Sequence, residues 1–169
     1  ARLLKKELTE KGIKMVAYGP IDKRITSLSF NYRNHQKITV IDGNIGYTGG
    51  INLADEYINL ITRFGHWKDT AVMLKGEAVR SFTVMFLQLW SADLRSPEYH
   101  KFLSAPVPEQ RAAGFVMPYS DSPLDTDRVG EQVYIDLLNR AKKYVHIMTP
   151  YLILDQQMEN ALCYAARRG

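Results

Sequence analysis

The sequence has 169 residues, of which 46% are hydrophobic and 24% charged, and these values are typical of a folded globular protein and exclude a disordered chain. The formal net charge of +4 favours an anionic partner but falls well short of a dedicated basic arm for nucleic acid. A single cysteine, Cys163, excludes an internal disulfide, and no apolar run approaches the ~20 residues that a bilayer-spanning helix requires.

The first half of the chain predicts alternating helices and strands. Gly12 stands in the usual position after a helix end, and Asp42-Gly43 is a strong hairpin-turn signal. One face of the long helix over 77–95 should be buried, since its apolar residues recur at helical spacing. The expected elements are a helix over 4–11, strands over 13–18, 35–41, 44–49 and 67–75, a short helix over 52–57, and the helix over 77–95 with Val79, Phe82, Phe86, Leu89 and Trp90 on its buried face.

The second half repeats this alternation after a connector that contains Pro106 and Pro108. The pattern predicts strands over 115–117 and 144–148, a helix over 130–142, and a last helix that begins at Asp155, a good N-cap residue, and ends at Arg168. We therefore expect an α/β fold in which helices flank a mixed β-sheet.

One short motif suggests chemistry. Among the four histidines only His35 begins a His-x-Lys-x4-Asp pattern, which Lys37 and Asp42 complete. Residues two apart on a strand share a face, so His35 and Lys37 should point the same way. A two-residue loop at Asp42-Gly43 would pair residues whose numbers sum to about 85 to 87, which places Gly50 or Asn52 across from His35.

This set of side chains suits phosphoryl transfer. Lys37 and the Asn52 amide can bind non-bridging phosphate oxygens, and glycines at 49 and 50 allow backbone N–H groups to approach a phosphate closely. His35 is the only candidate nucleophile among them at neutral pH. Asp42 has two interpretations, because aspartate before glycine is also the preferred residue of a tight turn.

The stretch from Asn31-Tyr32-Arg33-Asn34-His35-Gln36-Lys37 to Ile51-Asn52-Leu53-Ala54-Asp55-Glu56-Tyr57 resembles the HKD motif of the phospholipase D superfamily, in its cardiolipin synthase form. Later blocks of that family are matched, in order, by Trp67-Lys68-Asp69-Thr70, Glu131-Gln132, Ala141-Lys142-Lys143 and Thr149-Pro150-Tyr151. The resemblance covers nearly the whole chain. It implies an internal, truncated piece of a two-repeat protein, with residues 1–105 from the end of the first repeat and 106–169 from the start of the second.

The resemblance also implies a two-step phosphatidyl transfer that uses no metal and no cofactor. In cardiolipin synthases one phosphatidylglycerol is the donor, a second is the acceptor, and glycerol is released. By position, His35 would be nucleophile or acid/base, and Lys37, Gly50 and Asn52 would bind the phosphate. Asp69 would be the carboxylate that orients a catalytic imidazole, although an exposed strand-edge charge explains it equally well.

The family uses two HKD motifs and this sequence has one. We therefore expect the second half-site to come from residues outside this chain, or from the partner in a homodimer. The expected partners are phosphatidylglycerol and a membrane surface, with no nucleic acid. We expect the whole protein at the bacterial cytoplasmic membrane, attached through other segments, and this piece to be soluble and inactive alone. Two alternatives are another phospholipase D-like phosphodiesterase, including a nuclease, and a non-catalytic module that binds anionic phospholipid.

Overall fold

A computed structural model describes residues 2–16, 34–63, 65–91, 98–104, 106–108, 113–122, 126–149 and 151–168. The chain forms two compact units, residues 1–118 and residues 119–169, and each is described on its own. The expected assignment of residues 1–105 and 106–169 to two repeats stays a prediction.

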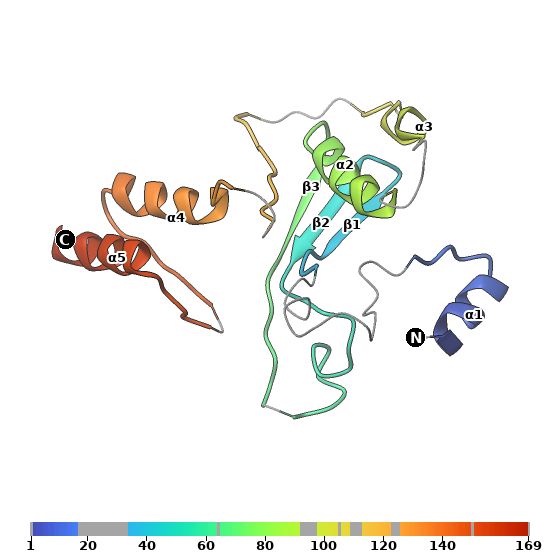
Figure 1. The fold of residues 1–169 in the computed structure, drawn as a ribbon, viewed down its shortest axis with the longest axis horizontal. Coiled ribbons are helices and arrows are strands. Elements are labelled where there is room, and N and C mark those ends of the chain that lie inside the picture. The colour runs from blue at the N-terminus through green and yellow to red at the C-terminus, as the bar shows by residue number, and fades with distance from the viewer. Residues whose placement is uncertain are drawn as a thin grey trace. The chain divides into compact units, whose positions relative to one another are not determined.

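The first unit contains a three-stranded antiparallel sheet of order β1-β2-β3 (Figure 1). Its strands are β1 (Ile38–Ile41), β2 (Ile45–Gly49) and β3 (Ala71–Lys75). Ile38 pairs with Thr48 and Ile41 with Ile45, so partner numbers sum to 86, inside the expected range. The β2–β3 ladder continues the sheet from Ile45↔Lys75 to Gly49↔Ala71.

The turn between β1 and β2 lies where Asp42-Gly43 predicts it. Asp42 and Gly43 both have positive φ, 51° and 68°, which is the signature of the primed turns that suit a twisted hairpin. The Asn44 N–H donates to the Ile41 carbonyl at 3.0 Å, yet pairing resumes only at Ile45. Asn44 is therefore one residue more than the expected two-residue loop.

Helix α2 (Val79–Trp90) packs on β1 and β2 (Figure 1). Val79, Phe82 and Leu87 of this helix are buried, and Val79 and Phe82 lie against Gly46 of β2. A Cβ at Gly46 would stand 2.6 Å from Cδ2 of Phe82, so glycine is required at this point of β2. The helix predicted over 77–95 forms over 79–90, and residues 92–95 lie outside the described part of the chain. Val79 and Phe82 are buried as predicted, whereas Leu89 and Trp90 are half-buried, Phe86 is 45% exposed, and Leu87 is buried instead.

Two further helices belong to the first unit. Helix α1 (Arg2–Glu10) ends as predicted, since Gly12 has φ +76° and the Ile13 N–H closes the helix end on the Leu8 carbonyl at 2.8 Å. Helix α3 (Tyr99–Leu103) is a short helix that the sequence pattern did not predict.

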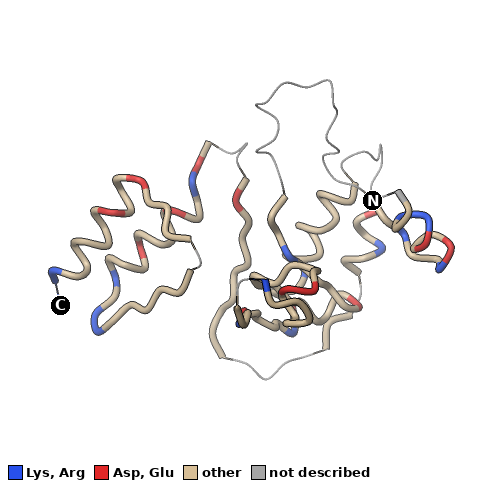
Figure 2. The backbone as a smooth tube through the Cα atoms, turned by 90° about the horizontal axis from the view of Figure 1, so that it is seen from below, with Lys and Arg blue, Asp and Glu red and all other residues tan. Residues whose placement is uncertain are grey.

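The second unit contains two helices, α4 (Val129–Arg140) and α5 (Gln156–Arg168), with acidic and basic residues along both (Figure 2). They run parallel, since Arg128 before α4 pairs with Asp155 before α5 and Arg168 at the end of α5 reaches the end of α4. The predicted N-cap is confirmed, because Asp155 Oδ1 accepts the Met158 N–H at 2.9 Å. Asp121 Oδ2 accepts the Gly130 N–H at 2.9 Å in the first turn of α4. The end of α4 is closed by Arg168, which donates to the carbonyls of Leu138, Asn139 and Ala141.

Four predicted elements are absent from the parts of the chain that the structure describes. Residues 13–16, 115–117 and 144–148 form no strand, and 52–57 forms bends and turns instead of a helix; residues 17–18 lie outside the described residues. A strand exists only where another strand pairs with it, and none of the described residues pairs with these segments. The α/β class itself is confirmed, because the described residues contain a sheet and five helices, of which α2 packs on the sheet. The pairing within the described sheet is antiparallel throughout.

Candidate functional site

His35 and Lys37 lie together just before β1, and their side chains touch. The Lys37 Nζ stands 2.9 Å from the His35 Nδ1, and it also donates to the His35 carbonyl at 2.7 Å. The predicted strand began at His35, whereas β1 begins at Ile38, so both residues belong to the lead-in of the strand. His35 is exposed and Lys37 half-buried, which leaves both groups open to a ligand.

The two side chains point away from helix α2. Asn34, Gln36 and Ile38 line a shallow pocket together with Phe86, Leu89 and Trp90 of α2. Extended backbone alternates its side chains, so residues 35 and 37 point to the other side, as the sequence predicted. The contact between Lys37 and His35 agrees with this arrangement.

The contact with Lys37 determines how the His35 ring can react. An ammonium group only donates hydrogen bonds, so Nδ1 of His35 is the acceptor. A neutral imidazole whose Nδ1 accepts carries its proton on Nε2. Nε2 of a neutral His35 in this arrangement therefore donates a hydrogen bond, and a nucleophilic Nε2 would require an acceptor at Nδ1 in place of Lys37.

Asp42 lies at the opposite end of β1 from this pair. It is exposed in the turn, with φ +51°, a conformation that aspartate tolerates better than most residues. Four strand residues separate it from Lys37. Asp42 therefore lies in the tight turn, which is the second of the two interpretations that its sequence context allowed.

Gly50 and Asp69 come together where β2 ends and β3 begins. The Gly50 N–H donates to the Thr70 carbonyl at 3.3 Å, and a Cβ at Gly50 would lie 2.5 Å from Oδ1 of Asp69. The absence of a side chain at position 50 therefore makes room for the Asp69 carboxylate. Asp69 is half-buried, and its two interpretations, an orienting carboxylate and an exposed strand-edge charge, stay open.

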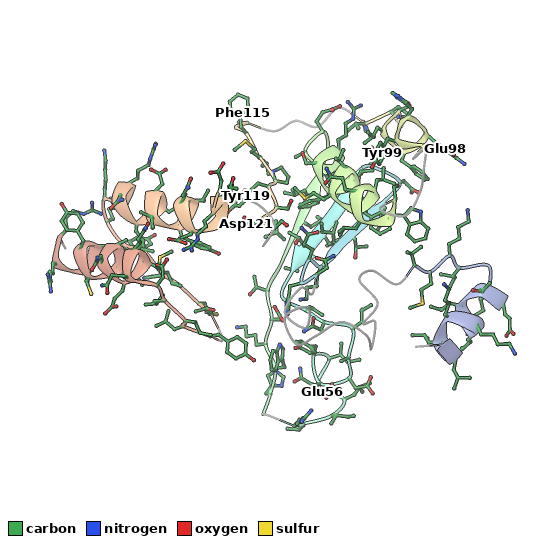
Figure 3. All side chains as sticks on the ribbon, in the orientation of Figure 1. Glu56, Glu98, Tyr99, Phe115, Tyr119 and Asp121 are labelled. Atoms are coloured by element: carbon green, nitrogen blue, oxygen red, sulfur yellow. The ribbon has the colours of Figure 1, made fainter. Side chains whose placement is uncertain are left out.

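Asn52 follows Gly50 in a loop that runs from the end of β2 to β3 and carries Glu56 (Figure 3). It is half-buried, and its carbonyl accepts the Ala54 N–H at 3.0 Å. The register of β1 and β2, continued beyond the Ile38↔Thr48 pair, would set Gln36 opposite Gly50 and His35 opposite residue 51. Gly50 and Asn52 thus flank the position across from His35.

The candidate site is not assembled into a catalytic triad in this structure. Asp69 accepts hydrogen bonds from the Trp67 indole and the Thr70 N–H, and the described residues contain no hydrogen bond between Asp69 and His35. Among the same residues, no group of three or more His, Cys, Asp or Glu side chains could hold a metal ion. The expectation of a metal-free and cofactor-free reaction stays a prediction.

Sequence reasoning assigned no role to Asn59 or Trp67, which lie near Asp69, or to the pair His66 and Lys68. Side-chain hydrogen bonds of Asn59 and Trp67 lead to Asp69. The only signal in the sequence was that both side chains, an amide and an indole, can form hydrogen bonds. His66 has Lys68 two residues on, which repeats the first half of the motif; Met73 stands where Asp is required. Both His66 and Lys68 are exposed.

Curated relatives match this chain over almost its whole length. A Streptococcus mutans protein named only as uncharacterized is 57% identical over 97% of the chain. The cardiolipin synthase of Geobacillus thermodenitrificans is 36% identical, and cardiolipin synthase 2 of Bacillus anthracis 37%, each over 96% of the chain. These matches confirm the resemblance to cardiolipin synthases that the motifs predicted.

The chain spans about a third of the length of these relatives, 35% of the first and 33% and 32% of the two synthases. No family model matches the chain, and no solved structure matches it significantly. No helix in the described part of the chain combines the length and the apolar character needed to cross a membrane.

Proposed function

We propose that this chain, homologous over nearly its whole length to a third of several cardiolipin synthases, supplies one half of the active site of a phosphatidyltransferase. The observation that carries this proposal is the contact between His35 and Lys37 at the start of the hairpin. An imidazole and an ammonium in contact on an open surface provide a nucleophile or acid together with a phosphate ligand.

The proposed reaction converts two phosphatidylglycerol molecules to cardiolipin and glycerol. A histidine nitrogen attacks the phosphorus of the first lipid, a P–N bond forms, and the P–O bond to the headgroup glycerol breaks. A second histidine gives that glycerol oxygen its proton. It then takes the proton of a headgroup hydroxyl on the second lipid, whose oxygen attacks phosphorus as the P–N bond breaks.

Lys37 links substrate binding to the question of which ring nitrogen of His35 carries the proton. A phosphodiester carries a full negative charge, so it binds the ammonium more strongly than the neutral Nδ1 does. When Lys37 moves to the phosphate, Nδ1 of His35 becomes free to carry the ring proton, and a carboxylate that accepts a hydrogen bond from Nδ1–H would keep the lone pair on Nε2. Asp69 is our candidate for that carboxylate, by the logic of an acid that fixes an imidazole tautomer.

The second histidine would come from outside these 169 residues or from a partner copy, because His35 alone begins the full motif. The remaining assignments follow the same proposal. Lys37, Gly50 and Asn52 would bind the phosphate, and the membrane surface that holds phosphatidylglycerol would be the partner. Asp42 contributes the turn that closes the hairpin.

A covalent trap tests the proposal in the whole protein that contains this chain. The protein is incubated with vesicles of phosphatidylglycerol labelled in the phosphate, and label retained on denatured protein is measured together with cardiolipin. His35→Ala should reduce both by at least about a thousandfold, since the loss of a nucleophile or its acid removes most of the catalysis. His66→Ala is the matched control and should leave both near the parent level, and cardiolipin formation unchanged in His35→Ala would contradict the proposal.

A further inference from the structure

We propose that Asn59 and Trp67 act as positioning residues for Asp69, an inference that rests on the proposed function. The two residues form a continuous chain of hydrogen bonds from the loop between β2 and β3 to the carboxylate beside Gly50. Neither residue contacts the His35–Lys37 pair, so the proposed action is indirect and passes through Asp69.

The chain begins at Asn59, which has a left-handed backbone with φ +60°. Its side-chain amide binds both polar groups of the Trp67 backbone: Nδ2 donates to the Trp67 carbonyl at 2.9 Å, and Oδ1 accepts the Trp67 N–H at 2.6 Å. A side-chain amide thus replaces one rung of a β-ladder. Asn59 fixes Trp67 in a segment that has no regular secondary structure.

The ring of Trp67 is then fixed on two sides. It packs on the ring of Tyr57, with centroids 4.6 Å apart and planes inclined by 58°. Its indole Nε1 donates to Oδ2 of Asp69 at 3.2 Å. Tilted aromatic packing and a directional N–H bond together leave the indole one orientation.

Asp69 receives this bond on one oxygen and a second bond on the other. Oδ1 accepts the Thr70 N–H at 2.7 Å and lies against Gly50, and Oδ2 accepts the indole. The Thr70 bond alone would leave the carboxylate free to turn about that contact. The indole bond fixes its plane, and with it the direction of any lone pair offered to an imidazole.

The geometric half of the proposal is tested by NMR of the 15N-labelled chain. Trp67 and Trp90 give the two indole N–H signals, and Trp90 serves as the internal reference because it packs on Phe86, with ring centroids 5.8 Å apart. Asp69→Ala should shift the Trp67 indole signal and speed its exchange with water, and Asn59→Gly, which keeps the left-handed backbone accessible, should do the same. An unmoved Trp67 signal in Asp69→Ala, with Trp90 also unmoved, would overturn the proposal.

The functional half is tested in the whole protein with phosphatidylglycerol vesicles. Trp67→Phe keeps an aromatic ring for Tyr57 and removes the N–H. It should lower kcat about tenfold to a hundredfold, with KM for the lipid unchanged, since a hydrogen bond to a charged group is lost. Trp90→Phe, the same change at the other tryptophan, is the matched control and should keep kcat near the parent value.

A double variant separates this inference from the proposed function. In an Asp69→Asn background Trp67→Phe should cause no further loss, because the residue acts through Asp69. A loss of equal size in both backgrounds would overturn the positioning role while leaving the function of the site intact. Normal kcat in Asp69→Asn would instead contradict the role of Asp69, whatever the NMR result.

Discussion

The two compact units are stabilised in different ways. In the first, α2 packs on the sheet through Val79 and Phe82, and Gly46 lets the helix approach the strand. In the described part of the second, Leu138 and Ala161 are the buried apolar side chains, and α4 and α5 are joined at one end by Arg128 and Asp155 and at the other by Arg168. Apolar packing is sensitive to volume, whereas helix-end bonds are sensitive to charge, so the units should respond to different substitutions.

The largest effect is expected at the close approach in the first unit. Gly46→Ala would place a Cβ 2.6 Å from a ring carbon of Phe82, and we expect a loss of about 1–3 kcal/mol in the free energy of unfolding of that unit. Hydrogen exchange of the β1 and β2 amides measures the loss, with α4 amides as the internal reference. Adding Phe82→Leu should recover part of it, and strictly additive losses would show that the two positions are not in conflict.

The corresponding substitution in the second unit is Arg168→Ala. It removes three hydrogen bonds of 2.8, 2.8 and 3.0 Å to carbonyls at the end of α4. We expect a loss of about 1–2 kcal/mol, measured by exchange of α4 and α5 amides, with no change in β1 and β2. Arg167→Ala, one residue earlier in the same helical turn, is the matched control; losses of equal size would contradict a specific role for Arg168.

A smaller effect on stability is expected from Gly50→Ala, because the Cβ would meet the end of the half-buried Asp69 side chain instead of a ring packed in the core. Oδ1 of Asp69 would have to move from its 2.5 Å position, at a cost of less than about 1 kcal/mol. The Trp67 indole signal should nevertheless shift, since its acceptor moves. An unchanged signal would mean that Gly50 does not determine where Asp69 lies.

The second unit should also depend on pH through Asp155. The Met158 N–H, and Arg128 at 3.2 Å, lower the pKa of this carboxyl below its ordinary value. A lowered pKa in the folded state means that this stabilisation is present above about pH 3.9, the unfolded value, and is lost as the pH falls through the folded value. Acid titrations followed by α5 exchange should show a shallower decrease for Asp155→Asn than for the parent, and parallel curves would contradict this linkage.

Much of the fold could be predicted because local signals were strong. Gly12, the Asp42-Gly43 turn and the Asp155 cap marked element ends that the structure confirms. The strands predicted over 13–18 and 144–148 do not form in the residues that the structure describes. Periodicity predicts which side chains share a face of a strand, but it does not predict which strand pairs with it. Likewise Phe86 had the right spacing for burial, yet Leu87 is the buried residue.

The sequence by itself determined the candidate chemistry: a histidine and a lysine two residues apart in extended backbone must share a face. Only the tertiary structure decided which residues surround them. Asp69 reaches Gly50 through the β2–β3 ladder, and Asn59 reaches Trp67 across an irregular loop. Such contacts depend on how the chain returns upon itself, and neither spacing nor residue type specifies that path.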